Sequence, residues 1–215
     1  MTSSDLIHAL HIVAFAIIIG IEVPSLYALH LARRSSTSPT ARALALQVRR
    51  WTYAMGALVL VTFLPFGVSM AIEIGVYTLM SPTWMTATWI VALVWFALVL
   101  GAETMGQAKL AQRLYGTEIG LRFFVGAGHV YDGVIGFLGT GMIQTNWLAA
   151  KVVLFGVILI VSSVIRWQTR PVRFATDAQL EDEGLAERLT QAQWGSYLII
   201  ALALVAAWMG TIKPW

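Results

Sequence analysis

The sequence predicts an all-α, polytopic membrane protein, with six transmembrane helices forming one integral membrane domain over residues 1–215. The first observation is composition: 58% of the residues are hydrophobic and only 12% are charged. A soluble domain carries about 25% charged residues, so most of this surface is expected to face lipid. The second observation is that the chain contains six apolar stretches of about 20 residues, the length that crosses a bilayer.

The predicted spans follow one another with short or polar connections. They are 5–32, 51–77, 84–106, 122–143, 147–166 and 191–211. In the first span, Pro24 lacks a backbone donor and leaves the carbonyl of Gly20 free, which favours a kink. Residues 109–122 are expected to form a loop, and the polar stretch 166–193 is expected to hold a surface helix.

The basic residues predict an orientation. Six spans place both termini on one side of the membrane, and the fourteen Lys and Arg residues then divide unequally between the two sides. The other side of the membrane receives twelve of them, whereas Lys151 and Lys213 lie on the side of the termini. By the positive-inside rule, both termini lie outside the cytoplasm, and the expected location is a bacterial-type inner membrane.

Composition also excludes several classes of site. The chain has no cysteine, which rules out disulfides, thiolate metal sites, iron–sulfur clusters and covalently attached c-type haem. No basic patch interleaved with aromatic residues indicates nucleic-acid binding. The N-terminus, MTSSD, lacks the basic region of a signal peptide, so the first helix is expected to remain in the mature protein.

The first predicted helix carries an ionisable stripe. At 100° per residue, His8, His11 and Glu22 fall on one stripe about 80° wide. Such groups are costly in a membrane unless they face protein, water or a ligand, so the stripe should point into the bundle. With a rise of about 1.5 Å per residue, His11 lies roughly 8 Å and Lys151 about 6 Å below the outer surface. These two side chains predict a site near the outer face.

Two further histidines are candidate ligands. His129 lies in the predicted span 122–143, about 10 Å above the inner surface, on a face with Gly126, Gly133 and Gly136. Small residues on one face permit close approach by another helix or by a flat macrocycle. His30 is expected near the inner surface. Histidine in a membrane serves as a metal ligand, a proton relay or a hydrogen-bonding group, and all three uses stay open here.

Four acidic residues fall within or near the predicted spans. Glu22 is expected at mid-membrane, with Glu73, Glu103 and Asp132 on other helices. Together they could form a proton path. Each could instead pair with an arginine or accept a hydrogen bond from a hydroxyl group.

Short motifs resemble a known family. Leu10 and His11 open a helix that runs through Gly20, a basic loop follows, and Trp147, Leu148 and Lys151 form a WLxxK turn. This pattern resembles HemJ-type protoporphyrinogen oxidases, and the related CopD-like membrane proteins share the early histidine. The resemblance implies that the chain binds haem b and that His11 and Lys151 act as a functional pair. For a CopD-like protein the ligand would be copper.

The expected function is that of a haem-b-binding membrane oxidoreductase or electron-transfer subunit. The candidate cofactor-binding residues are His8, His11, His30 and His129, of which His11 and His129 would ligate the iron. Lys151 and Glu22 are the candidate catalytic residues. Expected partners are the lipid bilayer, a quinone or a redox protein, and further subunits of the same or another kind.

Three alternatives remain open at this point. They are a HemJ-like oxidase acting on a porphyrinogen, a copper or small-solute transporter, and a non-catalytic anchor of a larger complex. In the transporter, Glu22, Glu73 and Asp132 would line a path. The chain lacks closely spaced methionines such as MxxM, and this absence disfavours a copper channel.

Overall fold

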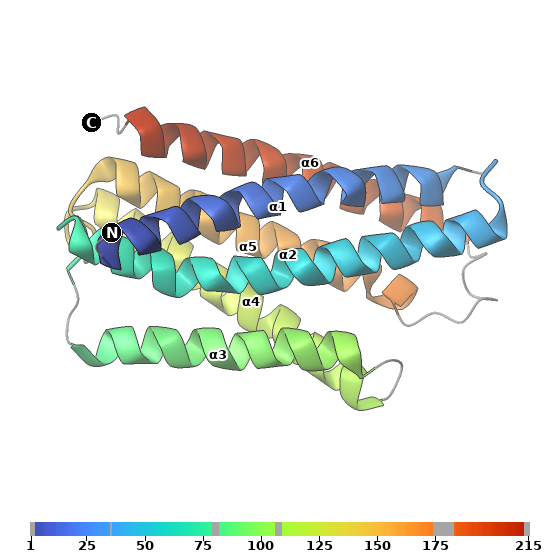
Figure 1. Cartoon of the computed structure of the whole chain (residues 1–215), viewed down its shortest axis with the longest axis horizontal. Helices are drawn as coiled ribbons and strands as arrows, with labels where there is room; N and C mark the ends of the chain where they lie inside the picture. The colour runs from blue at the N-terminus through green and yellow to red at the C-terminus, as the bar shows by residue number, and fades with distance from the viewer. Residues whose placement is uncertain (1–2, 35, 79–81, 106–108, 174–182, 213–215) are drawn as a thin grey trace.

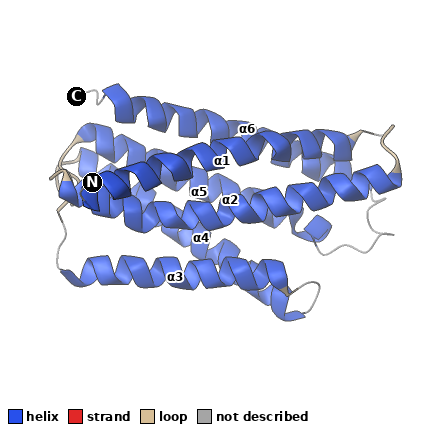
Figure 2. Ribbon diagram, in the orientation of Figure 1, coloured by secondary structure: helices blue, strands red, loops and turns tan. Residues whose placement is uncertain are grey.

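The computed structural model describes residues 3–34, 36–78, 82–105, 109–173 and 183–212, and these residues form six α-helices. The helices are α1 (Ser3–Arg33), α2 (Pro39–Glu73), α3 (Pro82–Thr104), α4 (Lys109–Phe137), α5 (Asn146–Arg173) and α6 (Glu183–Ile212). Figure 2 shows no strand in the described ranges. They contain only an isolated antiparallel bridge between Tyr77 and Ile143. The predicted all-α class and the six helices are confirmed.

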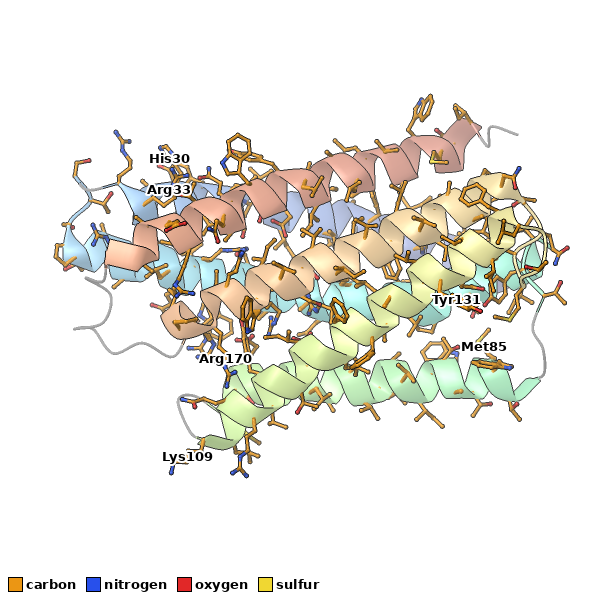
Figure 3. All side chains as sticks on the ribbon, turned by 180° about the vertical axis from the view of Figure 1, so that it is seen from behind. His30, Arg33, Met85, Lys109, Tyr131 and Arg170 are labelled. Atoms are coloured by element: carbon orange, nitrogen blue, oxygen red, sulfur yellow. The ribbon has the colours of Figure 1, made fainter. Side chains whose placement is uncertain are left out.

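The helices run side by side as a bundle (Figure 1). α1 packs along α2, α4 packs along α5, and α6 contacts both α5 and α1. α3 lies at one edge, against α2 and α4. α1 begins and α6 ends at the same end of the bundle, which we call the terminal end. At the opposite end lie His30, Arg33, Lys109 and Arg170 (Figure 3), and we call it the basic end.

The outer surface of the bundle is apolar. Five helices are long and apolar enough to cross a membrane, whereas α4 does not meet that description. In those five, only 11% to 39% of the most apolar stretch is buried inside the molecule. Large side chains such as Ile12 and Leu93 are 56% and 64% exposed. A surface of this kind is solvated by hydrocarbon, so the protein belongs in a lipid bilayer.

α2 begins twelve residues before the predicted span. Ser38 is its N-cap, and the Ser38 hydroxyl accepts a hydrogen bond from the Ala41 amide at 3.3 Å. Pro39 follows as the first helical residue, where its missing N–H costs nothing. The basic stretch expected to be a linker is therefore mostly the first part of α2.

α4 shows the largest difference from the prediction. It begins at Lys109, so residues 109–122 are helical rather than a loop. The reason is a buried face made by Ala111, Tyr115, Glu118 and Arg122, which recur at spacings of four, three and four. Because two of these four residues are charged, hydrophobic periodicity alone does not detect the face. The helix ends at Phe137, and Gly139 follows with a φ of +69°, a conformation that glycine adopts freely.

The last two helices also extend beyond their predicted bounds. α5 continues to Arg173 instead of ending at residue 166, and α6 begins at Glu183 instead of residue 191. The expected surface helix over 166–193 is thus divided between the end of α5 and the start of α6. Its central part, 174–182, lies outside the described residues.

α4 and α5 approach each other through glycines. A Cβ added at Gly133 would lie 2.7 Å from the Ala149 carbonyl oxygen, and one at Gly126 would lie 2.9 Å from the Gly156 carbonyl oxygen. The two backbones are therefore in direct contact. The glycine face of α4 was expected to contact either another helix or a flat macrocycle. In the structure it is covered by helix α5.

Candidate functional site

The centre of the bundle contains a buried ion-pair network. Glu118 of α4 accepts a hydrogen bond from the Arg122 Nε at 2.8 Å, and its other oxygen lies 2.8 Å from the Nε of Arg166 on α5. The indole of Trp95 on α3 donates to the same carboxylate at 3.0 Å. Each of these four residues is at most 1% exposed. Buried charges persist only when paired and hydrogen-bonded, which this carboxylate achieves through three partners.

The network continues toward the basic end. Glu103 of α3 lies 3.1 Å from Arg166, 3.3 Å from Arg173 and 3.6 Å from Arg50. The Arg50 side chain is 37% exposed, whereas that of Arg166 is 1% exposed. Ionised groups thus extend without interruption from the buried centre to the surface. Together they tie α2, α3, α4 and α5.

A second group of polar contacts links α2 with α1 and α5. Arg49 donates a hydrogen bond to the Ser25 hydroxyl and lies 4.5 Å from the centre of the Tyr53 ring. The Tyr53 hydroxyl donates to the Ser162 carbonyl at 2.9 Å, and Arg122 donates to the Ser162 hydroxyl at 3.1 Å. Tyr53 therefore lies between the Arg49 contact and the ion-pair network.

Glu22 lies at the wall of a small cavity. The cavity has a volume of about 30 Å³ and is lined by residues of α1, α2, α4, α5 and α6. Its polar lining residues are Glu22, Tyr53, Arg122 and Ser162. The Oε2 atom of Glu22 is buried and has no hydrogen-bond partner. Arg49 and the Ser196 hydroxyl of α6 are its polar neighbours.

The structure brings His11 and Lys151 together near the terminal end. Lys151 is close enough to interact electrostatically with His11, as is His8 one turn away. The Nδ1 atom of His11 is buried without a hydrogen-bond partner, and its ring meets that of Phe63 edge-on at 4.7 Å. The Lys151 ammonium lies 5.8 Å from the centre of the Trp147 ring. His8 itself is exposed.

His129 is linked to His11 by a chain of ring contacts. Its ring is 5.1 Å from that of Phe155, which is 6.1 Å from the Phe63 ring that contacts His11. Two phenylalanines on α5 and α2 thus connect the two histidines. The expected position near the inner surface assumed a helix starting at residue 122. Because α4 starts at Lys109, His129 lies twenty residues along the helix and deeper in the bundle.

Of the remaining candidates, Asp132 lies one turn from His129 and is close enough to interact with it electrostatically, whereas His30 and Glu73 are exposed. His30 is exposed at the basic end. Asp132 accepts a hydrogen bond from the Tyr77 hydroxyl at 3.3 Å, and Glu73 is exposed at the end of α2. Burial and the nearby Asp132 carboxylate raise the pKa of Tyr77 above its ordinary value.

These positions bear on the transporter alternative. Glu22 lines the small cavity, Asp132 is bonded to Tyr77 and Glu73 is exposed, so these three acidic residues have different surroundings. The described residues do not contain a group of three or more His, Asp or Glu side chains that could hold a metal ion.

Comparisons of the chain with known protein families, with curated proteins and with solved structures give no match. The side chains themselves therefore have to indicate the function. Among them, the network of Glu118, Arg122 and Arg166 was not predicted from the sequence. The spacing of Tyr115, Glu118 and Arg122 on one helical face is the signal that could have revealed it.

Proposed function

We propose that the protein is a haem-b-binding membrane protein of the electron-transfer or oxidoreductase class, with His11 and His129 as the iron ligands. The observation that carries this proposal is the His11 ring, which has a buried, unpartnered nitrogen beside a lysine. A bound haem would supply reversible one-electron chemistry at its iron.

The donors on this chain fit such a group. The His129 Nδ1 lies 2.7 Å from the Val125 carbonyl oxygen. Because a carbonyl only accepts, Nδ1 carries the proton and Nε2 keeps the lone pair that a metal requires. Lys151 supplies a cation for a carboxylate beside His11. The rings of Phe63 and Phe155 lie between the two histidines and make their surroundings apolar.

The His11–Lys151 pair also supports a narrower proposal. This is the pair that the HemJ-type resemblance implies, so a porphyrinogen is the substrate to try first. In that reaction Lys151 would bind a substrate carboxylate, and a quinone or a redox protein would accept the electrons.

A reduced-minus-oxidised absorption spectrum of the purified protein tests the proposal. The wild-type protein should show a b-type haem band, and His11→Ala should lose most of it while the protein still inserts in the membrane. His30→Ala is the matched control, because His30 is exposed at the basic end. A colourless wild-type protein, or an unchanged haem content in His11→Ala, contradicts the proposal.

A further inference from the structure

Four acidic residues in the described ranges are buried or half-buried, and their surroundings differ. Asp132 accepts a hydrogen bond from the Tyr77 hydroxyl at 3.3 Å. Glu103 is paired with three arginines, and Glu118 with two arginines and an indole. Glu22 takes part in no ion pair among the described residues, and its Oε2 lacks a hydrogen-bond partner. An ionised carboxylate in this state is costly at membrane depth, whereas a protonated one is far less so.

The groups that face Glu22 leave its carboxyl incompletely satisfied. Arg49 of α2 is already bonded to the Ser25 hydroxyl and lies against the Tyr53 ring. On α6, Ser196 contributes one neutral hydroxyl. From α4, Arg122 lines the same cavity but is held by Glu118 and Ser162. No cation is therefore dedicated to Glu22.

The cavity beside Glu22 has room and partners for water. Its volume of about 30 Å³ exceeds the roughly 10–15 Å³ that one water needs. A buried water also needs two to four polar partners. Tyr53, Arg122, Ser162 and Glu22 offer donors and acceptors from four helices.

We propose that this cavity holds water and that Glu22 is a proton-binding site served by that water. A hydronium ion reaching the cavity transfers its proton to the Glu22 Oε2 and leaves a neutral water behind. The reverse step returns the proton, and no electron moves. Through Arg122, the polar wall of the cavity joins the ion-pair network that ends at the half-exposed Arg50. This proposal does not depend on haem.

Infrared spectroscopy of the protein in lipid vesicles tests the site. The wild-type protein should show the carbonyl stretch of a protonated carboxyl group, and the band should shift on transfer to heavy water. Glu22→Gln should abolish it. Glu187→Gln is the control, because Glu187 is exposed on α6 and should leave the band in place. If no band depends on Glu22 at any pH at which the protein stays folded, then Glu22 is an ionised counter-ion of Arg49 and the proposal is wrong.

A second pair of variants tests the water. Gly56 lines the cavity, and a Cβ there meets only Ile21, at 3.9 Å. Gly56→Leu should keep the Glu22 band but slow its exchange with heavy water several-fold. Gly20→Leu is the matched control, because Gly20 is exposed with nothing within 4 Å of an added Cβ. If Gly56→Leu does not fold, Gly56→Ala replaces it. If the Glu22 band exchanges with heavy water as fast in Gly56→Leu as in Gly20→Leu, the cavity water does not serve Glu22 and this part of the proposal is wrong.

Discussion

Glu118 is the residue on which the interior depends most directly. Its carboxylate is fully buried and joins Trp95, Arg122 and Arg166, which come from α3, α4 and α5. Lipid offers no alternative partner for an arginine at this position. The geometry of the three helices is therefore linked to one side chain.

Removing that side chain should be severely destabilising. Glu118→Ala leaves two buried arginines without their shared partner, which costs about 3–5 kcal/mol for a broken buried pair. Thermal unfolding in detergent measures the loss. Glu187→Ala, at an exposed position on α6, should unfold close to the wild-type temperature. Equal unfolding temperatures for the two variants would show that the network adds nothing to stability.

Tyr77 should control the stability of the terminal end at alkaline pH. Its pKa is raised first by burial and then by Asp132, so the folded protein keeps the phenolic proton. The unfolded chain releases that proton near pH 10. Stability should therefore fall as the pH rises above about 10, because the unfolded state then binds fewer protons. Unfolding followed against pH should show a shallower alkaline decline in Tyr77→Phe, and an identical slope would contradict this assignment.

At the scale of single residues, the sequence could predict which polar side chains lie close together only where they interrupt long apolar runs. The approach of His11 to Lys151 follows from their similar depth. By contrast, Glu118 and Arg122 lie in a segment rich in charge, which resembles a surface loop. Their burial depends on Arg166, more than forty residues away, and local pattern carries no information about that pairing.

At the scale of helices, the contact between α4 and α5 is set by glycine. A side chain at Gly133 would meet the Ala149 carbonyl oxygen at 2.7 Å and the Val153 side chain at 2.6 Å. The helices can approach this closely only without a Cβ at that position.

Substituting this glycine should separate the two helices. Gly133→Ala should cost about 1–3 kcal/mol, since a backbone oxygen must move. Gly128→Ala is the control on the same helix, because Gly128 is exposed and nothing lies within 4 Å of an added Cβ. That variant should be neutral or slightly stabilising, as alanine favours helix. Thermal unfolding of both variants tests this prediction. Similar unfolding temperatures for the two variants would mean that the α4–α5 contact accommodates an added methyl group.

The number and order of the helices could be predicted because each contains a long apolar run. Their ends could not, since helices in this protein extend beyond the apolar run into charged segments. In α2 the Ser38 cap and Pro39 mark the start at a distance from the hydrophobic stretch. In α4 the buried face itself contains the charges.

At the scale of the whole molecule, α4 decides the number of membrane spans. Its 29 residues span about 44 Å, more than the roughly 30 Å of the hydrocarbon core. The charged side chains of Glu118 and Arg122 are buried inside the bundle, whereas Phe124 and Val134 are 74% and 46% exposed. The outward face is thus apolar although the composition is not, and we propose six spans with both termini outside the cytoplasm.

Reporter fusions that are active on only one side of the membrane test this topology. A reporter near Ser38 should report the cytoplasm, because it lies among the basic residues of the basic end. Reporters placed within 79–81 and after Trp215 should both report the outside. If the chain had five spans, with α4 on the membrane surface, the reporters near Ser38 and within 79–81 would give the same results. Only the reporter after Trp215 would then lie in the cytoplasm. The complete reversal of all three would instead contradict the positive-inside assignment. The reporter after Trp215 therefore measures the span count, while the other two measure orientation and serve as its controls.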